Sequence, residues 1–378
     1  MSEQKIIFNY VLLKLASRCN LKCTYCYWFK DDSVMKKPPI LTKEAEQAFL
    51  VKLRKHIVEY DLKTFSILFH GGEPLMFGKQ RFIDLCYELR KMEKELGLKL
   101  VLAITTNAVT VDDEWATILY YYGVAVTVSV DPTPESHNKF RVDLRKQGSY
   151  ERTFRGFQKL RDFDLKPNAL AVCDPDADAD HVFLHFIDGL GLKSFDVLIP
   201  DVDHESEIPQ ISRFYRQFFD RWYDTYSYQG VQVRLFENII KAMLGGRSRM
   251  ESMGLGTLAT HTLNTDGSLE AVDILRIAGD SHTQSKINII THDFNDVVHD
   301  ELWQEARDAS NQIADVCKAC RYKVACGGGH VAHRWSNENR YNNPSAYCGQ
   351  LYEILSHIEE RIFSDLSYKQ VQSAEMTQ

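Results

Sequence analysis

The stretch Cys19-Asn20-Leu21-Lys22-Cys23-Thr24-Tyr25-Cys26 decides how the rest of the chain is interpreted. No regular helix or strand points thiols at this spacing toward one spot, so we expect a loop that wraps around them. A loop that gathers three thiolates binds a metal ion or an iron–sulfur cluster. Three cysteines leave one iron of a four-iron cluster without a protein ligand, so that iron can bind a small molecule.

A structural zinc loop is the alternative interpretation of these cysteines. Zinc prefers a fourth cysteine or histidine ligand nearby. Residues 27–41 offer only Asp31 and Asp32. The sequence therefore favours a cluster with an open iron.

Composition narrows the class of protein. The 378 residues include 45 basic and 52 acidic ones, a net charge of -7, which argues against a nucleic-acid partner. The start, Met1 to Lys5, lacks a signal-peptide pattern, and no apolar run reaches membrane-spanning length. We therefore expect a cytoplasmic protein with no membrane partner. Its nine cysteines are not expected to form disulfides, and seven of them fall in two groups at ligand-like spacings.

Strands and helices alternate along the first 200 residues. This pattern predicts an α/β fold with a parallel sheet, and its six units predict a partial (β/α)6 TIM barrel that is open on one side. Polar residues follow the strands, where the active sites of parallel barrels lie. The predicted strands cover residues 6–17, 65–69, 99–104, 125–130, 167–172 and 194–199.

After about residue 230 the regular alternation of strands and helices stops. A strand over 231–236 and a helix over 239–244 are expected first, and then a hairpin of strands 258–263 and 269–274 around an Asp-Gly turn. The predicted division is a barrel over 6–230, a bridging region over 231–252, an auxiliary domain over 253–349 and a C-terminal helix and tail over 350–378.

A second cysteine group lies in the predicted auxiliary domain. Cys317, Cys320, Cys326 and Cys348 supply four thiolates, whereas Cys86 and Cys173 stand alone. Zinc is the alternative here too, because a Cys-x2-Cys pair suits either metal.

The first cysteine loop resembles the signature of the radical S-adenosylmethionine (SAM) superfamily, including Tyr25 before the third cysteine. The resemblance implies that Cys19, Cys23 and Cys26 hold a [4Fe-4S] cluster whose open iron binds SAM. One electron then produces a 5′-deoxyadenosyl radical, and an electron donor such as flavodoxin or ferredoxin is implied.

Other motifs of that superfamily have counterparts after the next strands. Gly71, Gly72 and Glu73 resemble the motif for the SAM amino group. Positions corresponding to the ribose and carboxylate contacts are Asn107, Ser129 and Arg141; a surface charge is the alternative role for Arg141. The family's Ser-x-Asp-Gly is Ser129-Val130-Asp131-Pro132 here, so Pro132 departs from it.

The late cysteines resemble the SPASM/twitch extension, which carries auxiliary four-iron clusters. Val272 and His330 stand where relatives have cysteines, so the resemblance implies one auxiliary [4Fe-4S] cluster and about eight irons per chain. A cluster that uses His261 and His330 is a less favoured alternative. In related peptide-modifying enzymes an acid directly after the hairpin cysteine lies near the substrate. Asp273 occupies that place, after Val272, and a solvated strand carboxylate is the alternative.

One motif is similar to that of maturases that build cyclophanes in ribosomally made peptides. It reads Cys326-Gly-Gly-Gly-His330-x3-Arg334-Trp335-Ser336. This resemblance implies a ribosomally synthesised precursor peptide as partner, hydrogen abstraction at a β-carbon, and a carbon–carbon crosslink to an aromatic ring with Asp273 as base. The alternatives are thioether bridging, epimerisation, formylglycine-type oxidation, or a non-catalytic iron–sulfur scaffold that binds SAM. Since the barrel begins by about residue 6, we expect the leader peptide to bind another surface or a separate protein.

Overall fold

The described part of the chain forms two compact units, each made of two separate stretches. The first unit contains Met1–Ala171 and Leu258–Asp308, and the second contains Val172–Thr257 and Ala309–Gln378. The predicted domain boundaries stay a prediction, because compact units need not coincide with functional domains. The computed structural model describes residues 6–30, 32–248, 250–256, 260–279 and 282–375.

A largely parallel sheet forms the centre of the first unit. Its strands are β1 (Tyr10–Ala16), β2 (Thr64–Gly71), β3 (Lys99–Thr106), β4 (Ala125–Ser129), β5 (Asn168–Val172), β8 (Thr262–Leu263) and β9 (Leu269–Glu270). Their order is β5-β4-β3-β2-β1-β8-β9, and every neighbouring pair is parallel except β8 and β9. The hairpin β8–β9 therefore lies directly beside β1, although about 250 residues separate them in sequence.

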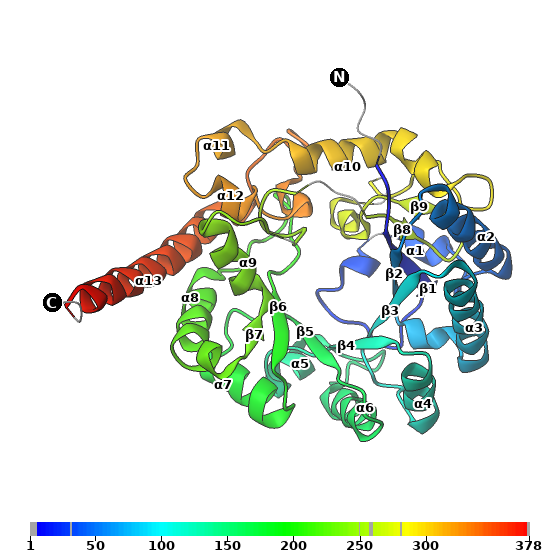
Figure 1. Ribbon diagram of the computed structural model, residues 1–378, viewed down its shortest axis with the longest axis horizontal. Coiled ribbons are helices and arrows are strands. Elements are labelled where there is room, and N and C mark those ends of the chain that lie inside the picture. Colours follow the sequence, from blue (N-terminus) through cyan, green and yellow to red (C-terminus); the bar gives the residue numbers. More distant parts are fainter. Residues whose placement is uncertain (1–5, 31, 249, 257–259, 280–281, 376–378) are drawn as a thin grey trace. The chain divides into compact units, whose positions relative to one another are not determined.

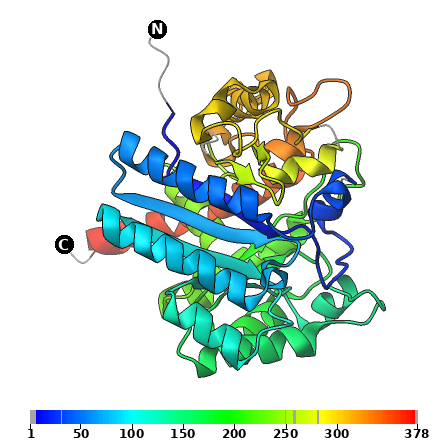
Figure 2. The ribbon, with the colours of Figure 1, turned by 90° about the vertical axis from the view of Figure 1, so that its right-hand side faces the viewer.

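Helices lie along the outer side of these strands (Figure 1), and Figure 2 shows α2 and α3 running alongside them. Thr42 caps the first helix by accepting a hydrogen bond from the Ala45 N–H, and Gly97 ends the next one in the left-handed conformation. The predicted α/β fold with a parallel sheet is confirmed. The helices of this unit are α1 (Ser33–Lys36), α2 (Lys43–Glu59), α3 (Lys79–Leu96), α4 (Asp113–Tyr121), α5 (Pro134–Phe140) and α6 (Tyr150–Asp162).

The second unit contains two parallel strands, β6 (Ser194–Leu198) and β7 (Gln232–Val233). Cys173, directly after β5, donates its backbone N–H to the Leu198 carbonyl at 2.9 Å. The aromatic side chains of the helix after residue 211 are buried, so they pack in the core of this unit. The helices are α7 (Ala179–Phe183), α8 (Ser212–Arg221), α9 (Arg234–Met243), α11 (Asp315–Lys318), α12 (Lys323–Cys326) and α13 (Cys348–Glu375), and α10 (Glu301–Asn311) includes the junction between the units.

Two predicted strands are wrong in extent. The strand expected over 231–236 ends at Val233, because Leu235, Phe236 and Ile239 form the buried stripe of α9 instead. The strand expected over 269–274 ends at Glu270, and a 3-10 helix, Asp273–Ala278, follows. Residues 258 and 259 of its predicted partner lie outside the described residues.

None of the helices in the described ranges is both long and apolar enough to cross a membrane.

Candidate active site

The early cysteine loop has neither helix nor strand geometry over residues 19–26. It is fixed by backbone hydrogen bonds from the Lys22 N–H to the Val142 carbonyl at 2.7 Å and from the Thr24 N–H to the Phe140 carbonyl at 2.9 Å. The expected wrapped loop is therefore present, and its shape is set by the segment after α5.

The three thiols of the early loop are free and partly buried. Burial raises the pKa of the Cys19, Cys23 and Cys26 thiols, so a bound metal centre would be needed to ionise them. Three neighbouring thiols of this kind suit a metal ion or an iron–sulfur cluster.

Gly71 and Gly72 allow the end of β2 to press against the start of the cysteine loop. A Cβ on Gly71, whose φ is +139°, would lie 2.0 Å from the Ala16 carbonyl oxygen, and one on Gly72 would lie 2.4 Å from that of Arg18. The Gly72 N–H also donates to the Ala16 carbonyl at 2.9 Å. Backbone contact within the protein, rather than approach to a ligand alone, therefore requires both glycines.

The Glu73 carboxylate is buried and bonded to protein groups. It accepts hydrogen bonds from the Thr106 hydroxyl at 2.7 Å, the Asn107 backbone N–H at 2.8 Å and the Leu75 N–H at 3.0 Å. The Asn107 side-chain amide in turn donates to the Asn20 side-chain oxygen at 2.7 Å. Glu73 thus fastens the end of β2 to the end of β3, and Asn107 joins that end to the cysteine loop.

Tyr25, Asp131 and Arg141 form a buried hydrogen-bonded group beside the thiols. The Tyr25 hydroxyl donates to Asp131 at 2.7 Å and accepts from Arg141 Nη1 at 2.7 Å. Arg141 is only 9% exposed, so it is not a solvated surface charge. Its Nε is buried and has no hydrogen-bond partner among the described residues, which suits a carboxylate ligand. Ser129, the last residue of β4, is partly buried.

Asp273 is buried at the start of the 3-10 helix, 6% exposed, and is not a solvated carboxylate. Its Oδ2 forms an ion pair with Lys14 and accepts a hydrogen bond from the Tyr27 hydroxyl at 2.7 Å. Burial alone would raise the pKa of Asp273, but Lys14, His70 and Tyr27 together hold that pKa well below its usual range. Asp273 is therefore a stable carboxylate.

Lys14 was not among the predicted site residues. It is fully buried in β1 and donates to both Asp273 and His70 Nδ1, the latter at 3.0 Å. Burial, and then the Lys14 charge, lower the pKa of His70 to about 3, so that ring is neutral. The available signal was a single lysine inside the apolar run Val11–Ala16, on the strand that enters the cysteine loop.

A second buried ion pair lies next to Asp273. Arg276 makes two 2.6 Å hydrogen bonds to Glu270 and stacks on the Trp28 ring, 4.5 Å from its centroid. Val272 is buried. The His261 ring packs against Phe8 with centroids 4.5 Å apart, and its pKa is lowered to about 3 by burial. His261 thus belongs to an aromatic core.

The late cysteines Cys317, Cys320, Cys326 and Cys348 line one cavity of about 210 Å³ in the second unit. A cavity of this size, lined by four thiols, can accommodate a compact inorganic group. Burial raises the pKa of Cys326 to about 12. Cys86 and Cys173 are buried free thiols.

Comparison with known proteins agrees with this geometry. Residues 13–176 match the model of the Radical SAM superfamily. This region is a radical SAM domain. Such domains use a [4Fe-4S] cluster and SAM, which makes the chain an oxidoreductase-type enzyme.

Three relatives resemble the chain over most of its length. The cysteine-type anaerobic sulfatase-maturating enzyme of Clostridium perfringens is 24% identical over 94% of this chain and 97% of its own. The structure of native anSMEcpe with bound AdoMet and Kp18Cys peptide has a TM-score of 0.80 at 22% identity, covering 95% of this chain and 99% of that one. Streptococcus suis SuiB bound to its precursor peptide SuiA has a TM-score of 0.60 at 16% identity, covering 90% and 76%. These likenesses show a shared fold.

Proposed function

We propose that this protein is a radical SAM peptide maturase that forms a carbon–carbon crosslink between a β-carbon and an aromatic ring of a ribosomal precursor peptide. The observation that carries the proposal is the Asp273 carboxylate, buried and kept ionised in the same unit as the cysteine loop. Two relatives are named with a bound peptide, which supports a peptide as substrate.

Cys19, Cys23 and Cys26 would hold the SAM cluster, and Arg141, oriented by Tyr25, would bind the SAM carboxylate. Backbone groups around Gly71, Gly72 and Glu73 would receive the amino group, with Asn107 and Ser129 toward the ribose. When bound, the cluster and SAM supply a radical that removes a hydrogen atom from the substrate. The four late cysteines would hold an auxiliary [4Fe-4S] cluster that accepts an electron.

The β-carbon radical bonds to the aromatic ring, and the resulting adduct must lose one electron and one proton to become aromatic again. Asp273 takes that ring proton. Lys14 and Tyr27 both bond to Oδ2, and no described residue bonds to Oδ1, so Oδ1 is the proton acceptor. A carboxylate with so low a pKa takes protons only from strong acids. An aromatic carbon that has gained a bond and lost an electron carries such an acidic proton, because losing it restores aromaticity.

Formylglycine-type oxidation is the second candidate, favoured by the named sulfatase-maturating relatives. It starts from a cysteine thiol, with a pKa of about 8.5, or a serine hydroxyl, which is weaker still as an acid. The ion pair with Lys14 makes Asp273 a weaker base toward either group than a free carboxylate is, which supports the crosslink as the first candidate.

Mass spectrometry of a precursor peptide co-expressed from a small reading frame beside the gene tests the proposal. We expect loss of two hydrogens per crosslink and no fragmentation between the joined residues. Reaction of the product with a hydrazide would reveal an aldehyde and support formylglycine instead. Deuterium uptake at Cα without a mass loss would indicate epimerisation.

The variant Asp273→Asn separates the cleavage of SAM from the crosslinking of the peptide. We expect this variant to produce 5′-deoxyadenosine from SAM and dithionite but to lose crosslinked product by at least about 100-fold, in line with removal of a general base. Asp266→Asn is the control, because Asp266 lies in the half-buried hairpin turn and pairs with Lys37 rather than Lys14; this variant should retain both activities. Absence of 5′-deoxyadenosine from the unaltered protein would favour a non-catalytic scaffold.

A further inference from the structure

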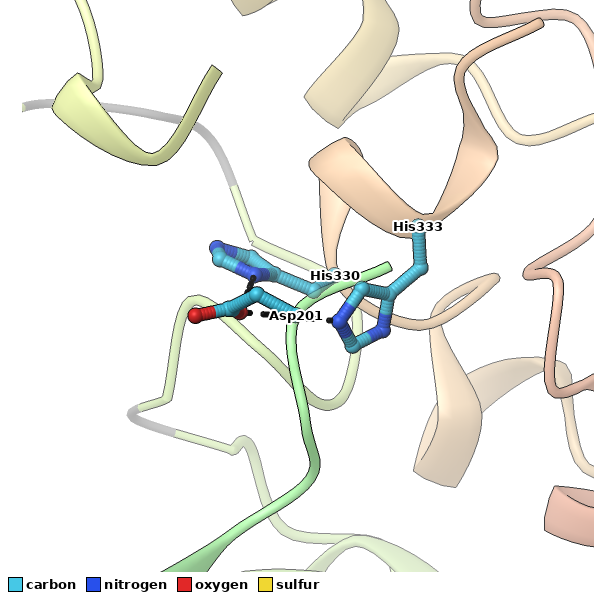
Figure 3. A group of neighbouring side chains, drawn as sticks. All are labelled: Asp201, His330 and His333. Carbon is cyan, nitrogen blue, oxygen red and sulfur yellow. Dashed lines mark ion pairs between the residues drawn. The ribbon is translucent and has the colours of Figure 1, made fainter. Parts of the chain in front are cut away.

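Asp201, His330 and His333 bring one carboxylate and two imidazoles together in the second unit, apart from the four late cysteines (Figure 3). Their ligand atoms all lie within 4.8 Å of one another. We propose that these three side chains form a mononuclear binding site for a divalent first-row transition ion. This site is independent of the proposed peptide crosslinking.

Chain geometry brings the two histidines to the same side. His333 lies in the 3-10 turn Val331–Arg334, and His330 is the N-cap residue directly before it. Side chains three positions apart eclipse one another in a 3-10 helix. The two rings accordingly lie 5.4 Å apart, nearly perpendicular, and both face Asp201 in Figure 3.

The distances suit a shared ion better than direct hydrogen bonds. Asp201 Oδ1 lies 3.7 Å from His333 Nε2 and 4.0 Å from His330 Nδ1. A direct N–H···O bond would be about 2.7–3.2 Å long. Ligands about 2.1 Å from one tetrahedral ion lie roughly 3.4 Å apart, so small side-chain rotations would complete the site.

An unsatisfied nitrogen is the independent observation that points to a ligand. The His333 side chain is only 3% exposed, and its Nε2 is buried without a hydrogen-bond partner among the described residues. Burying such a nitrogen unpaired costs free energy, and this nitrogen faces Asp201. Coordination of a cation would satisfy it.

Surrounding contacts hold the three ligands in place. The Tyr347 ring packs against His333 with centroids 5.3 Å apart, and its hydroxyl donates to the Pro200 carbonyl at 3.1 Å, next to Asp201. Arg334 donates to the Gln312 and Tyr341 carbonyls and so fixes the turn that carries both histidines. Contacts of this kind orient the ligands of a metal site.

The ligand set indicates which ions would bind. Two imidazole nitrogens and one carboxylate oxygen suit Zn²⁺, Fe²⁺ and similar ions rather than Mg²⁺ or Ca²⁺, which prefer oxygen ligands. Three protein ligands leave at least one position for water or another small ligand.

Zinc is the probe for the test. The cluster-loaded protein is dialysed against zinc sulfate and washed, and its zinc is counted and examined by X-ray absorption at the zinc edge. We expect one zinc per chain with Zn–N/O distances of about 2.0–2.1 Å and no Zn–S distance of about 2.3 Å. A zinc–sulfur signal, or no zinc above a blank, would overturn the proposal.

Variants locate the ion. Asp201→Asn and His330→Ala should each weaken zinc binding more than about 100-fold, since loss of even an outer-shell partner costs 10–100-fold. His204→Ala is the control, because His204 bonds to the Pro344 carbonyl outside the group. Unchanged iron content and visible spectrum confirm that each variant is folded. Full zinc retention by both ligand variants would contradict the site.

Discussion

Replacing Lys14 by methionine is expected to destabilise the first unit more than any exchange of a surface charge. Methionine keeps most of the side-chain volume but removes the ion pair with Asp273 and the contact of the ammonium with Trp28, 4.3 Å from its ring centroid. Lys14 is fully buried and Asp273 nearly so, so the carboxylate would remain buried without its cation. Breaking a buried pair in this way costs about 3–5 kcal/mol.

The size of the effect can be followed by anaerobic thermal unfolding of the cluster-loaded protein. A loss of about 4 kcal/mol lowers Tm by roughly 10 °C, because each kcal/mol shifts Tm by about 2–4 °C in a unit of this size. Lys79→Met is the matched control. Lys79 pairs with Asp112 and Glu114 on the surface, where such pairs contribute about 0–1 kcal/mol.

The pH dependence of the folding stability should also reverse in the Lys14→Met variant. In the unaltered protein the pKa of Asp273 is lowered on folding, so its stabilisation is complete above the unfolded pKa and is lost as pH falls through the lower folded value. Without Lys14, burial raises the folded pKa above the unfolded one. The charged carboxylate then destabilises the fold at neutral pH, and stability should recover as pH falls toward 5.

A double variant provides the decisive comparison. Lys14→Met/Asp273→Asn removes both charges, and it should recover most of the stability that Lys14→Met loses. A single variant that loses less than about 1 kcal/mol, or a double variant no more stable than the single one, would refute the assignment of a buried ion pair.

Three further outcomes are expected. Gly71→Ala should prevent stable folding, because its Cβ would meet a backbone oxygen at 2.0 Å. Gly78→Ala, with no atom within 4 Å, should cost only about 1–3 kcal/mol of backbone strain, and yields and thermal unfolding of the pair check this. Tyr25→Phe should raise the Kd for SAM roughly 10–100-fold by releasing Arg141, with little change in cluster absorbance, as measured by calorimetry. Cys348→Ser should lower iron from about eight to about four per chain while 5′-deoxyadenosine formation persists, and full iron retention would contradict an auxiliary cluster.

Elements with a strong local pattern were predictable. In β2, burial alternates strictly with Phe65, Ile67 and Phe69 inward, and the structure follows that pattern. Thr42 caps one helix and the left-handed Gly97 ends the next, and both residue types are local signals for helix ends. The wrapped cysteine loop also followed directly from thiol spacing.

Features that depend on distant contacts were not predictable. Asp273 was a candidate, but its partner Lys14 comes from a strand 259 positions away, and no local pattern reports such a pairing. Val272 and Ile274 have high strand propensity, yet the chain turns into a 3-10 helix where Asp273 meets Lys14. The approach of His333 to Asp201 likewise joins residues 132 positions apart in sequence, and no local pattern reports it.

The placement of the β8–β9 hairpin beside β1 has a consequence for biosynthesis. One edge of β1 stays unpaired until residues near 262 have emerged from the ribosome. At 5–20 residues per second that delay lasts roughly 10–50 s. During this interval the edge is an open template for pairing with other strands, and Lys14 lacks its counter-ion. Such a nonlocal closure is slow, and it makes the nascent first unit vulnerable to aggregation until its last strands arrive.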